Sequence, residues 1–145
     1  MRPISVLLVD DNRCFLDVLS RYLQAMGEGE VQVVGAVSDG REAVARALAT
    51  QPEVVCLDLH MPGLSGMSLL PRLREAMPLV TIVVVTTQDQ EYMRQRTLAM
   101  GADGFVAKED ITNDLLPTIR DLVAHTHGPG EAAPASRPKH VPRNP

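Results

Sequence analysis

Aromatic and clustered basic residues are scarce in this sequence. Its 145 residues include no tryptophan, two phenylalanines and two tyrosines, and the formal net charge is −4. Proteins that bind nucleic acids usually carry grouped Lys and Arg side chains with aromatic residues among them. Because the chain has no basic block, we expect that it binds no nucleic acid on its own.

Long apolar segments, targeting signals and cysteine patterns are also missing. No apolar run approaches the roughly 20 residues that a transmembrane helix needs, and the N-terminus lacks the pattern of a signal peptide. The two cysteines, Cys14 and Cys56, have neither disulfide nor metal-ligand spacing. We therefore expect a cytoplasmic protein without a membrane partner, of a length that fits one domain.

Short apolar runs alternate with helical patterns along most of the chain. Runs bounded by turn signals indicate buried strands, here at residues 4–9, 31–37, 54–57, 81–85 and 104–107. Five strand–helix units in succession predict an α/β fold with a parallel sheet covered on both faces. We expect a flavodoxin-like, doubly wound (βα)5 sheet in strand order 2-1-3-4-5, which places the first strand beside the third.

Three segments between or after these strands carry more specific expectations. Pro71 should interrupt or kink the helix that follows the loop 61–66. Residues 92–100 should form a short amphipathic helix. The segment 128–145 contains five prolines and no apolar periodicity, which predicts a disordered tail or linker stub after a domain at 1–127.

Polar side chains stand where four of the predicted strands end. Asp10 and Asp11 follow the first strand, Asp58 follows the third, Thr86 ends the fourth and Lys108 lies just past the fifth. The carboxyl ends of parallel strands meet at one edge of a sheet, where open α/β folds bind their ligands. We therefore expect these five side chains to gather at one site.

Three carboxylates at one site need a compensating charge. At 4 Å and an effective dielectric constant near 20, each pair of carboxylates repels by about 4 kcal/mol. Hard oxygen ligands suit Mg²⁺, Lys108 adds a fixed positive charge, and Thr86 adds a hydroxyl donor. An aspartate in such surroundings can act as a nucleophile and form an aspartyl-phosphate. Taken singly, each Asp could equally be a solvated turn residue.

Four segments together resemble the receiver domain of two-component response regulators. They are Val-Leu-Leu-Val-Asp10-Asp11-Asn, Asp58-Leu-His-Met-Pro-Gly-Leu-Ser-Gly66, Val-Val-Val-Thr86-Thr87 and Gly101-Ala-Asp-Gly-Phe-Val-Ala-Lys108. The resemblance extends over about residues 3–125. It implies a phospho-acceptor at Asp58, which would take a phosphoryl group from a histidine kinase or a histidine phosphotransfer protein.

The resemblance also implies roles for the residues around Asp58. Asp11, Asp58 and the backbone carbonyl of His60 would hold Mg²⁺ or Mn²⁺, with Asp10 binding directly or through water. Lys108 would contact the phosphoryl group. Thr86 and Phe105 would form the switch of the family. In this switch the hydroxyl moves toward the phosphoryl group and the aromatic side chain follows it.

Several of these assignments have competitors. Thr87 competes with Thr86 for the switch role, and core packing is an equal alternative for Phe105. The side chains of His60 and Gln88 would flank the path of the hydrolytic water and so tune dephosphorylation. His60 could instead be a plain rim residue.

The resemblance further implies a downstream protein target and a phosphorylation-dependent homodimer through the fourth helix, fifth strand and fifth helix. Enzymatic activity should be limited to self-catalysed phosphoryl transfer and autodephosphorylation. A magnesium-dependent phosphatase would want Asp-x-Asp after the first strand, where Asp10 and Asp11 are adjacent. A flavin-binding module would want a phosphate-binding loop there, which an acidic pair would oppose. A receiver cut from a DNA-binding transcriptional regulator remains the main alternative.

Overall fold

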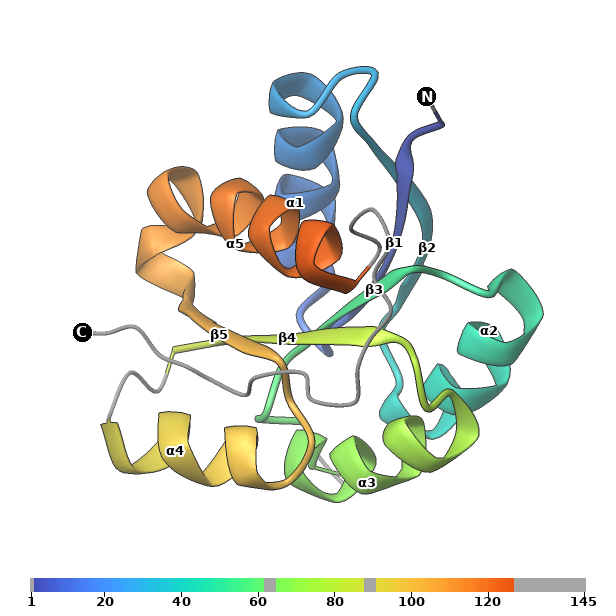
Figure 1. The fold of residues 1–145 in the computed structure, drawn as a ribbon, viewed down its shortest axis with the longest axis vertical. Helices are drawn as coiled ribbons and strands as arrows, with labels where there is room; N and C mark the ends of the chain where they lie inside the picture. The colour runs from blue at the N-terminus through green and yellow to red at the C-terminus, as the bar shows by residue number, and fades with distance from the viewer. Residues whose placement is uncertain (1, 62–64, 88–90, 127–145) are drawn as a thin grey trace.

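The computed structural model describes residues 2–61, 65–87 and 91–126. It contains one parallel five-stranded sheet in the order β2-β1-β3-β4-β5 (Figure 1). The strands are β1 (Ile4–Val9), β2 (Val31–Val37), β3 (Val54–Leu57), β4 (Thr81–Thr86) and β5 (Gly104–Ala107). The expected doubly wound fold is confirmed, with every predicted strand present. The proposed tail at 128–145 lies outside the described residues.

Helices cover both faces of the sheet. They are α1 (Arg13–Met26), α2 (Ala43–Thr50), α3 (Gly66–Ala76), α4 (Glu91–Ala99) and α5 (Ile111–Thr126), with short 3-10 turns at Gly40–Glu42 and Lys108–Asp110. Figure 1 shows α1 and α5 on one face and α2, α3 and α4 on the other. None of the helices in the described residues is long and apolar enough to cross a membrane.

Alternating side chains of the central strands feed two separate cores. Leu7 and Val9 of β1 point into the core under α2 and α3, whereas Leu8 points into the core under α1 and α5. This alternation follows from the two-residue period of a strand, and it explains why β1 and β3 read as continuous apolar runs. Cys56 is buried in the second core, and burial raises the pKa of its thiol to about 12.

Two expectations about helices are wrong in part. Pro71 does not interrupt its helix, since α3 runs unbroken from Gly66 to Ala76. Pro71 is exposed, so water can bond the carbonyl that it leaves unpaired one turn earlier. The helix α4 exists but is only weakly amphipathic: Thr97 is its buried residue, Met93 and Leu98 are half-buried against the core, and Tyr92 is exposed.

Arg74 ties together the amino ends of β4 and β5, at the opposite edge from the predicted site. Its guanidinium donates at 2.6–2.9 Å to the carbonyl oxygens of Pro78, Val80 and Gly101 and to Asp103 Oδ2. Asp103 Oδ2 also accepts from the backbone N–H of Ile82 at 2.8 Å. One half-buried side chain therefore satisfies three backbone carbonyls and a carboxylate.

We expect Arg74→Ala to lower the free energy of unfolding by about 2 kcal/mol, because partly buried acceptors and a carboxylate lose their donor. Urea denaturation measures the change. Arg72, exposed on the same helix, provides the control, and Arg72→Ala should stay within about 0.5 kcal/mol of the wild type. Equal losses in the two variants would contradict this role of Arg74.

Candidate functional site

The register of the sheet brings the acidic residues together. In the parallel pairing of β1 with β3, Val9 lies opposite Leu57. The next residues, Asp10 and Asp58, therefore leave the sheet side by side. Their backbones are held by the sheet itself, because the N–H of Asp58 donates to Val9 O at 2.9 Å and the N–H of Asp10 donates to Val37 O at 3.0 Å.

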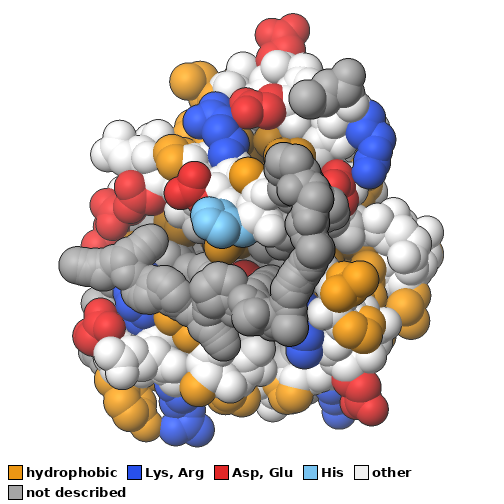
Figure 2. Space-filling model, viewed as in Figure 1, with side chains coloured by type: hydrophobic (Ala, Val, Ile, Leu, Met, Phe, Trp, Pro, Cys, Tyr) orange, Lys and Arg blue, Asp and Glu red, His pale blue; other side chains and the backbone are white. Residues whose placement is uncertain are grey.

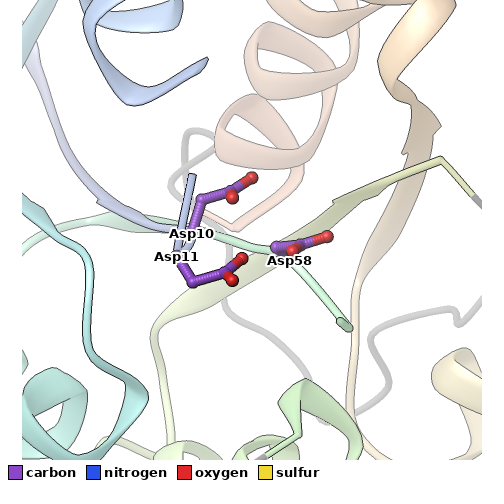
Figure 3. A group of neighbouring side chains, drawn as sticks. All are labelled: Asp10, Asp11 and Asp58. Atoms are coloured by element: carbon purple, nitrogen blue, oxygen red, sulfur yellow. The ribbon is translucent and has the colours of Figure 1, made fainter. Parts of the chain in front are cut away.

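The three carboxylates form one compact group. Ligand oxygens of Asp10, Asp11 and Asp58 all lie within 4.8 Å of one another. Asp10 and Asp58 are 3% and 4% exposed, whereas Asp11 is exposed. Figure 3 shows Asp11 reaching toward Asp58 from the end of β1. The group thus has two buried members and one on the solvent side.

Lys108 brings a positive charge to the same place. Thr86 pairs with Ala107 in the register of β4 with β5, so Lys108 follows β5 directly beside the end of β4. Its Nζ lies 2.7 Å from Asp10 Oδ2 and 3.9 Å from Asp58 Oδ1. In the described structure the ammonium therefore pairs first with Asp10 and only loosely with Asp58.

This arrangement raises the pKa of the Asp58 carboxyl above its ordinary value. Burial is the largest cause, followed by the negative charge of Asp10. Lys108 and a hydrogen bond from the backbone N–H of His60 act in the opposite direction but do not offset them. Asp58 is accordingly a carboxylate whose negative charge is poorly stabilised by the protein alone.

The donor set fits a divalent cation. Asp10 Oδ2 is buried and has no hydrogen bond of acceptable geometry among the described residues, although Lys108 Nζ is 2.7 Å away. A hard cation would bind this oxygen and relieve the repulsion among the three carboxylates. The cluster of Asp10, Asp11 and Asp58 could therefore bind a metal ion.

Two residues support the site in ways that the sequence did not reveal. Asn12 caps α1 by accepting from the N–H of Phe15 at 3.0 Å, and its own N–H donates to Asp10 Oδ1 at 2.9 Å. A Cβ at Gly66 would collide with the carbonyl oxygen of Asp58. The position after the acidic pair and the glycine that begins α3 were the available signals, but only the fold shows what they touch.

The switch candidates are close to the site but buried. Thr86 ends β4 and is fully buried, whereas Thr87 is exposed. Phe105 is 6% exposed and belongs to the same core as Leu7 and Val9, the core under α2 and α3. The guanidinium of Arg94 lies 5.0 Å from the centre of the Phe105 ring, a contact that sequence analysis missed because it joins α4 to β5.

The two candidates for tuning dephosphorylation are His60 and Gln88. The side chain of His60 is exposed beside Asp58, as a rim residue would be. Gln88 lies outside the described residues.

Comparison with known proteins identifies the family. The sequence matches the response regulator receiver domain over residues 6–120. The chain belongs to this family. Among solved structures, the response regulator domain of Thermotoga maritima CheB superposes with a TM-score of 0.76 at 28% identity, over 83% of this chain and 96% of that one. The chain is thus a receiver domain of the two-component type.

Curated relatives are longer than this receiver. Protein-glutamate methylesterase/protein-glutamine glutaminase 2 of Anaeromyxobacter dehalogenans is 40% identical over 114 residues, which cover 79% of this chain and 33% of that protein. Nitrate/nitrite response regulator protein NarL of Escherichia coli is 30% identical over 122 residues, covering 84% and 56%. The receiver therefore corresponds to about a third of the first relative and just over half of the second.

We expect Asp58→Asn to stabilise the metal-free receiver near neutral pH. Because folding raises the pKa of Asp58, the folded protein still holds a proton at pH values at which the unfolded chain has released it. The free energy of unfolding must then fall as pH rises from the ordinary value of 3.8 through the raised folded-state pKa. An amide removes this loss, so the gain should be present at neutral pH and vanish below the ordinary value.

Urea denaturation in a metal chelator, from about pH 3 to 8, follows this difference across the titration. The matched control is Asp121→Asn, at an exposed position of α5, which should show no such dependence on pH. A gain that persists unchanged at low pH, or that the control shares, would contradict the electrostatic origin.

Proposed function

We propose that this chain is a cytoplasmic, phospho-accepting response regulator whose Asp58 takes a phosphoryl group from a histidine kinase or a histidine phosphotransfer protein. One observation carries the proposal: a buried carboxylate with a raised pKa stands within one cluster of two further acids and a lysine. Membership of the receiver family supports it.

In the proposed transfer, an ionised oxygen of Asp58 attacks the phosphorus of a phosphohistidine. The new P–O bond forms while the P–N bond breaks, and the leaving imidazole keeps the electron pair and takes a proton from water. Lys108, with Nζ 3.9 Å from Asp58 Oδ1, would bind a phosphoryl oxygen. The hydroxyl of Thr86 would bind another.

The proposed cofactor is Mg²⁺, or Mn²⁺ in its place. Asp11, Asp58 and the backbone carbonyl of His60 would hold it, and Asp10 would bind directly or through water. When bound, the ion supplies positive charge to the carboxylates and to the phosphoryl oxygens. The buried Oδ2 of Asp10, which lacks a well-formed hydrogen bond, is the structural feature that most favours this site.

The proposed output is a change in protein contacts at α4, β5 and α5. Thr86 would move toward the phosphoryl group, and Phe105 would fill the space behind it, in a two-state shift of population. A downstream protein would read this surface, and a second copy of the chain could bind there in a homodimer. Acidic and basic side chains are mixed over the face shown in Figure 2, which favours a protein partner over nucleic acid.

The proposed receiver unit is residues 1–127, and residues 128–145 would be a Pro-rich tail or linker. Its only chemistry would be phosphoryl transfer to Asp58 and the loss of that group. A second candidate is the receiver portion of a DNA-binding regulator, favoured by the 25% identity, over 83% of this chain, to the signal receiver domain of a DNA binding response regulator protein from Colwellia psychrerythraea. In that case the output would belong to a domain outside this sequence.

Acetyl phosphate with Mg²⁺, followed by intact mass, tests the proposal directly. We expect a gain of one phosphoryl group in the wild type and none in Asp58→Asn. Asp11→Ala should lose both metal binding, measured by titration, and phosphorylation. Asp121→Asn is the control and should behave as the wild type. A full mass gain in Asp58→Asn would refute the assignment of Asp58.

We further propose that His60 and Gln88 flank the path of the hydrolytic water and set the lifetime of the phosphorylated form. A bulky His60 should hinder this water, and neither side chain offers a carboxylate to orient it. We expect His60→Ala and His60→Asn to lose the phosphoryl group several times faster than the wild type, with little dependence on pH. Decay rates from about pH 6 to 8, across the ordinary titration of His, measure this. Slower decay in both variants, with a pH dependence lost on substitution, would instead identify His60 as a base.

A further inference from the structure

Lys108 lies over an aromatic ring from the first helix. Its Nζ is 4.2 Å from the centre of the Phe15 ring, and the Lys108 side chain is only 16% exposed. Phe15 itself is half-buried and packs against the core under α1 and α5. The Lys108 ammonium therefore contacts the acid cluster on one of its sides and the face of the Phe15 ring on another.

Asp10, the acid that pairs with Lys108, also holds Phe15 in place through hydrogen bonds that pass by Asn12. Asp10 Oδ1 accepts from the backbone N–H of Asn12 at 2.9 Å, and Asn12 Oδ1 accepts from the backbone N–H of Phe15 at 3.0 Å. Asp10 Oδ2 lies 2.7 Å from Lys108 Nζ. These contacts close a ring of four residues, so the start of α1 and the lysine are located relative to one carboxylate.

An aromatic face has a particular effect on an ammonium group. The quadrupole of the ring attracts the cation, but the ring does not take up an N–H donor as a carboxylate does. An acid at this position would compete with Asp58 and a phosphoryl group for the charge, and an aliphatic side chain would not attract it. A phenyl ring can hold Lys108 at the site while its donors remain directed toward oxygen ligands.

We propose that Phe15 is a positioning residue for phosphoryl transfer, which holds the ammonium of Lys108 beside Asp58 through the face of its ring. This inference rests on the proposed function, because it gives Phe15 a role only if Lys108 binds the phosphoryl group. The competing explanation is that Phe15 merely fills the core, in which case an aliphatic residue of similar size would replace it fully.

Replacement of Phe15 by aromatic and aliphatic residues separates the two explanations. With acetyl phosphate and Mg²⁺, we expect Phe15→Leu to slow phosphorylation of Asp58 by about three- to tenfold, and Phe15→Tyr to stay within about twofold of the wild type. Phe15→Met offers a second aliphatic variant should the first lose its fold. Intact mass against time gives the rates, and thermal unfolding reports the stability of each variant.

Two further measurements address how Phe15 acts. In NMR spectra of the metal-free protein, the Lys108 Hε protons should be shifted upfield by the ring in the wild type and Phe15→Tyr, but not in Phe15→Leu. In a Lys108→Ala background, Phe15→Leu should cause no additional slowing. Tyr22→Leu removes the other aromatic ring of α1 from the same core, and it should leave the rate unchanged.

The results of these experiments separate the role of Phe15 from the proposed phosphorylation of Asp58. Normal phosphorylation of the wild type together with an equally fast Phe15→Leu variant overturns the role of Phe15 alone. Additional slowing by Phe15→Leu in the Lys108→Ala background also overturns it, because Phe15 would then act through another group. A wild type that gains no phosphoryl group overturns the proposed function and this inference with it.

Discussion

The repulsion between two buried carboxylates, Asp10 and Asp58, is the constraint on which the rest of the site depends. The parallel register of β1 with β3 places them side by side, and burial removes most of the water that would screen them. The protein does not relieve this repulsion completely, since Lys108 pairs closely with Asp10 and lies 3.9 Å from Asp58. The remaining repulsion raises the pKa of Asp58. For the same reason, a cation, or a phosphoryl group with its counter-ion, would stabilise the site.

Two uncharged residues, Gly66 and Asn12, make this crowding sterically and geometrically feasible. Gly66 lets the start of α3 approach the carbonyl oxygen of Asp58, where any side chain would collide. Asn12 uses its backbone to hold Asp10 and its side chain to begin α1. Because both residues act on the backbone around the acids, they fix where the carboxylates stand without altering the charge of the site. The two ends of the sheet differ in role. The acids lie at the carboxyl ends of the strands, whereas Arg74 holds the amino ends of β4 and β5 together in a purely structural role.

Much of the fold could be predicted because the central strands carry an unambiguous pattern. The bounds of β1 and β3 match the predicted runs, and β4 extends one residue further, to include Thr86. The gathering of Asp10, Asp11 and Asp58 followed from strand order alone. The nature of α4 could not be predicted fully, because its one buried residue is the polar Thr97, whereas its apolar Met93 and Leu98 are only half-buried against the core. The ring contacts could not be predicted either, because the contact of Lys108 with Phe15 joins elements distant in sequence and that of Arg94 with Phe105 depends on how α4 packs on β5.

Two cations of the described structure lie over aromatic rings, and these contacts bear on the proposed switch. Lys108 rests on Phe15 of α1, and Arg94 of α4 rests on Phe105 of β5. Attraction between a cation and a ring is weaker and less directional than a salt bridge with good geometry, so either cation can be drawn away by a stronger anion without breaking the core beneath it. A new phosphoryl group would compete most directly for Lys108, which already faces the acids. In the proposed switch, a shift of Thr86 toward that group would open space next to β5, where Phe105 packs in the core and its ring lies against the guanidinium of Arg94. A backbone frame held by hydrogen bonds, together with cations held by weaker ring contacts, is what the proposed switch requires.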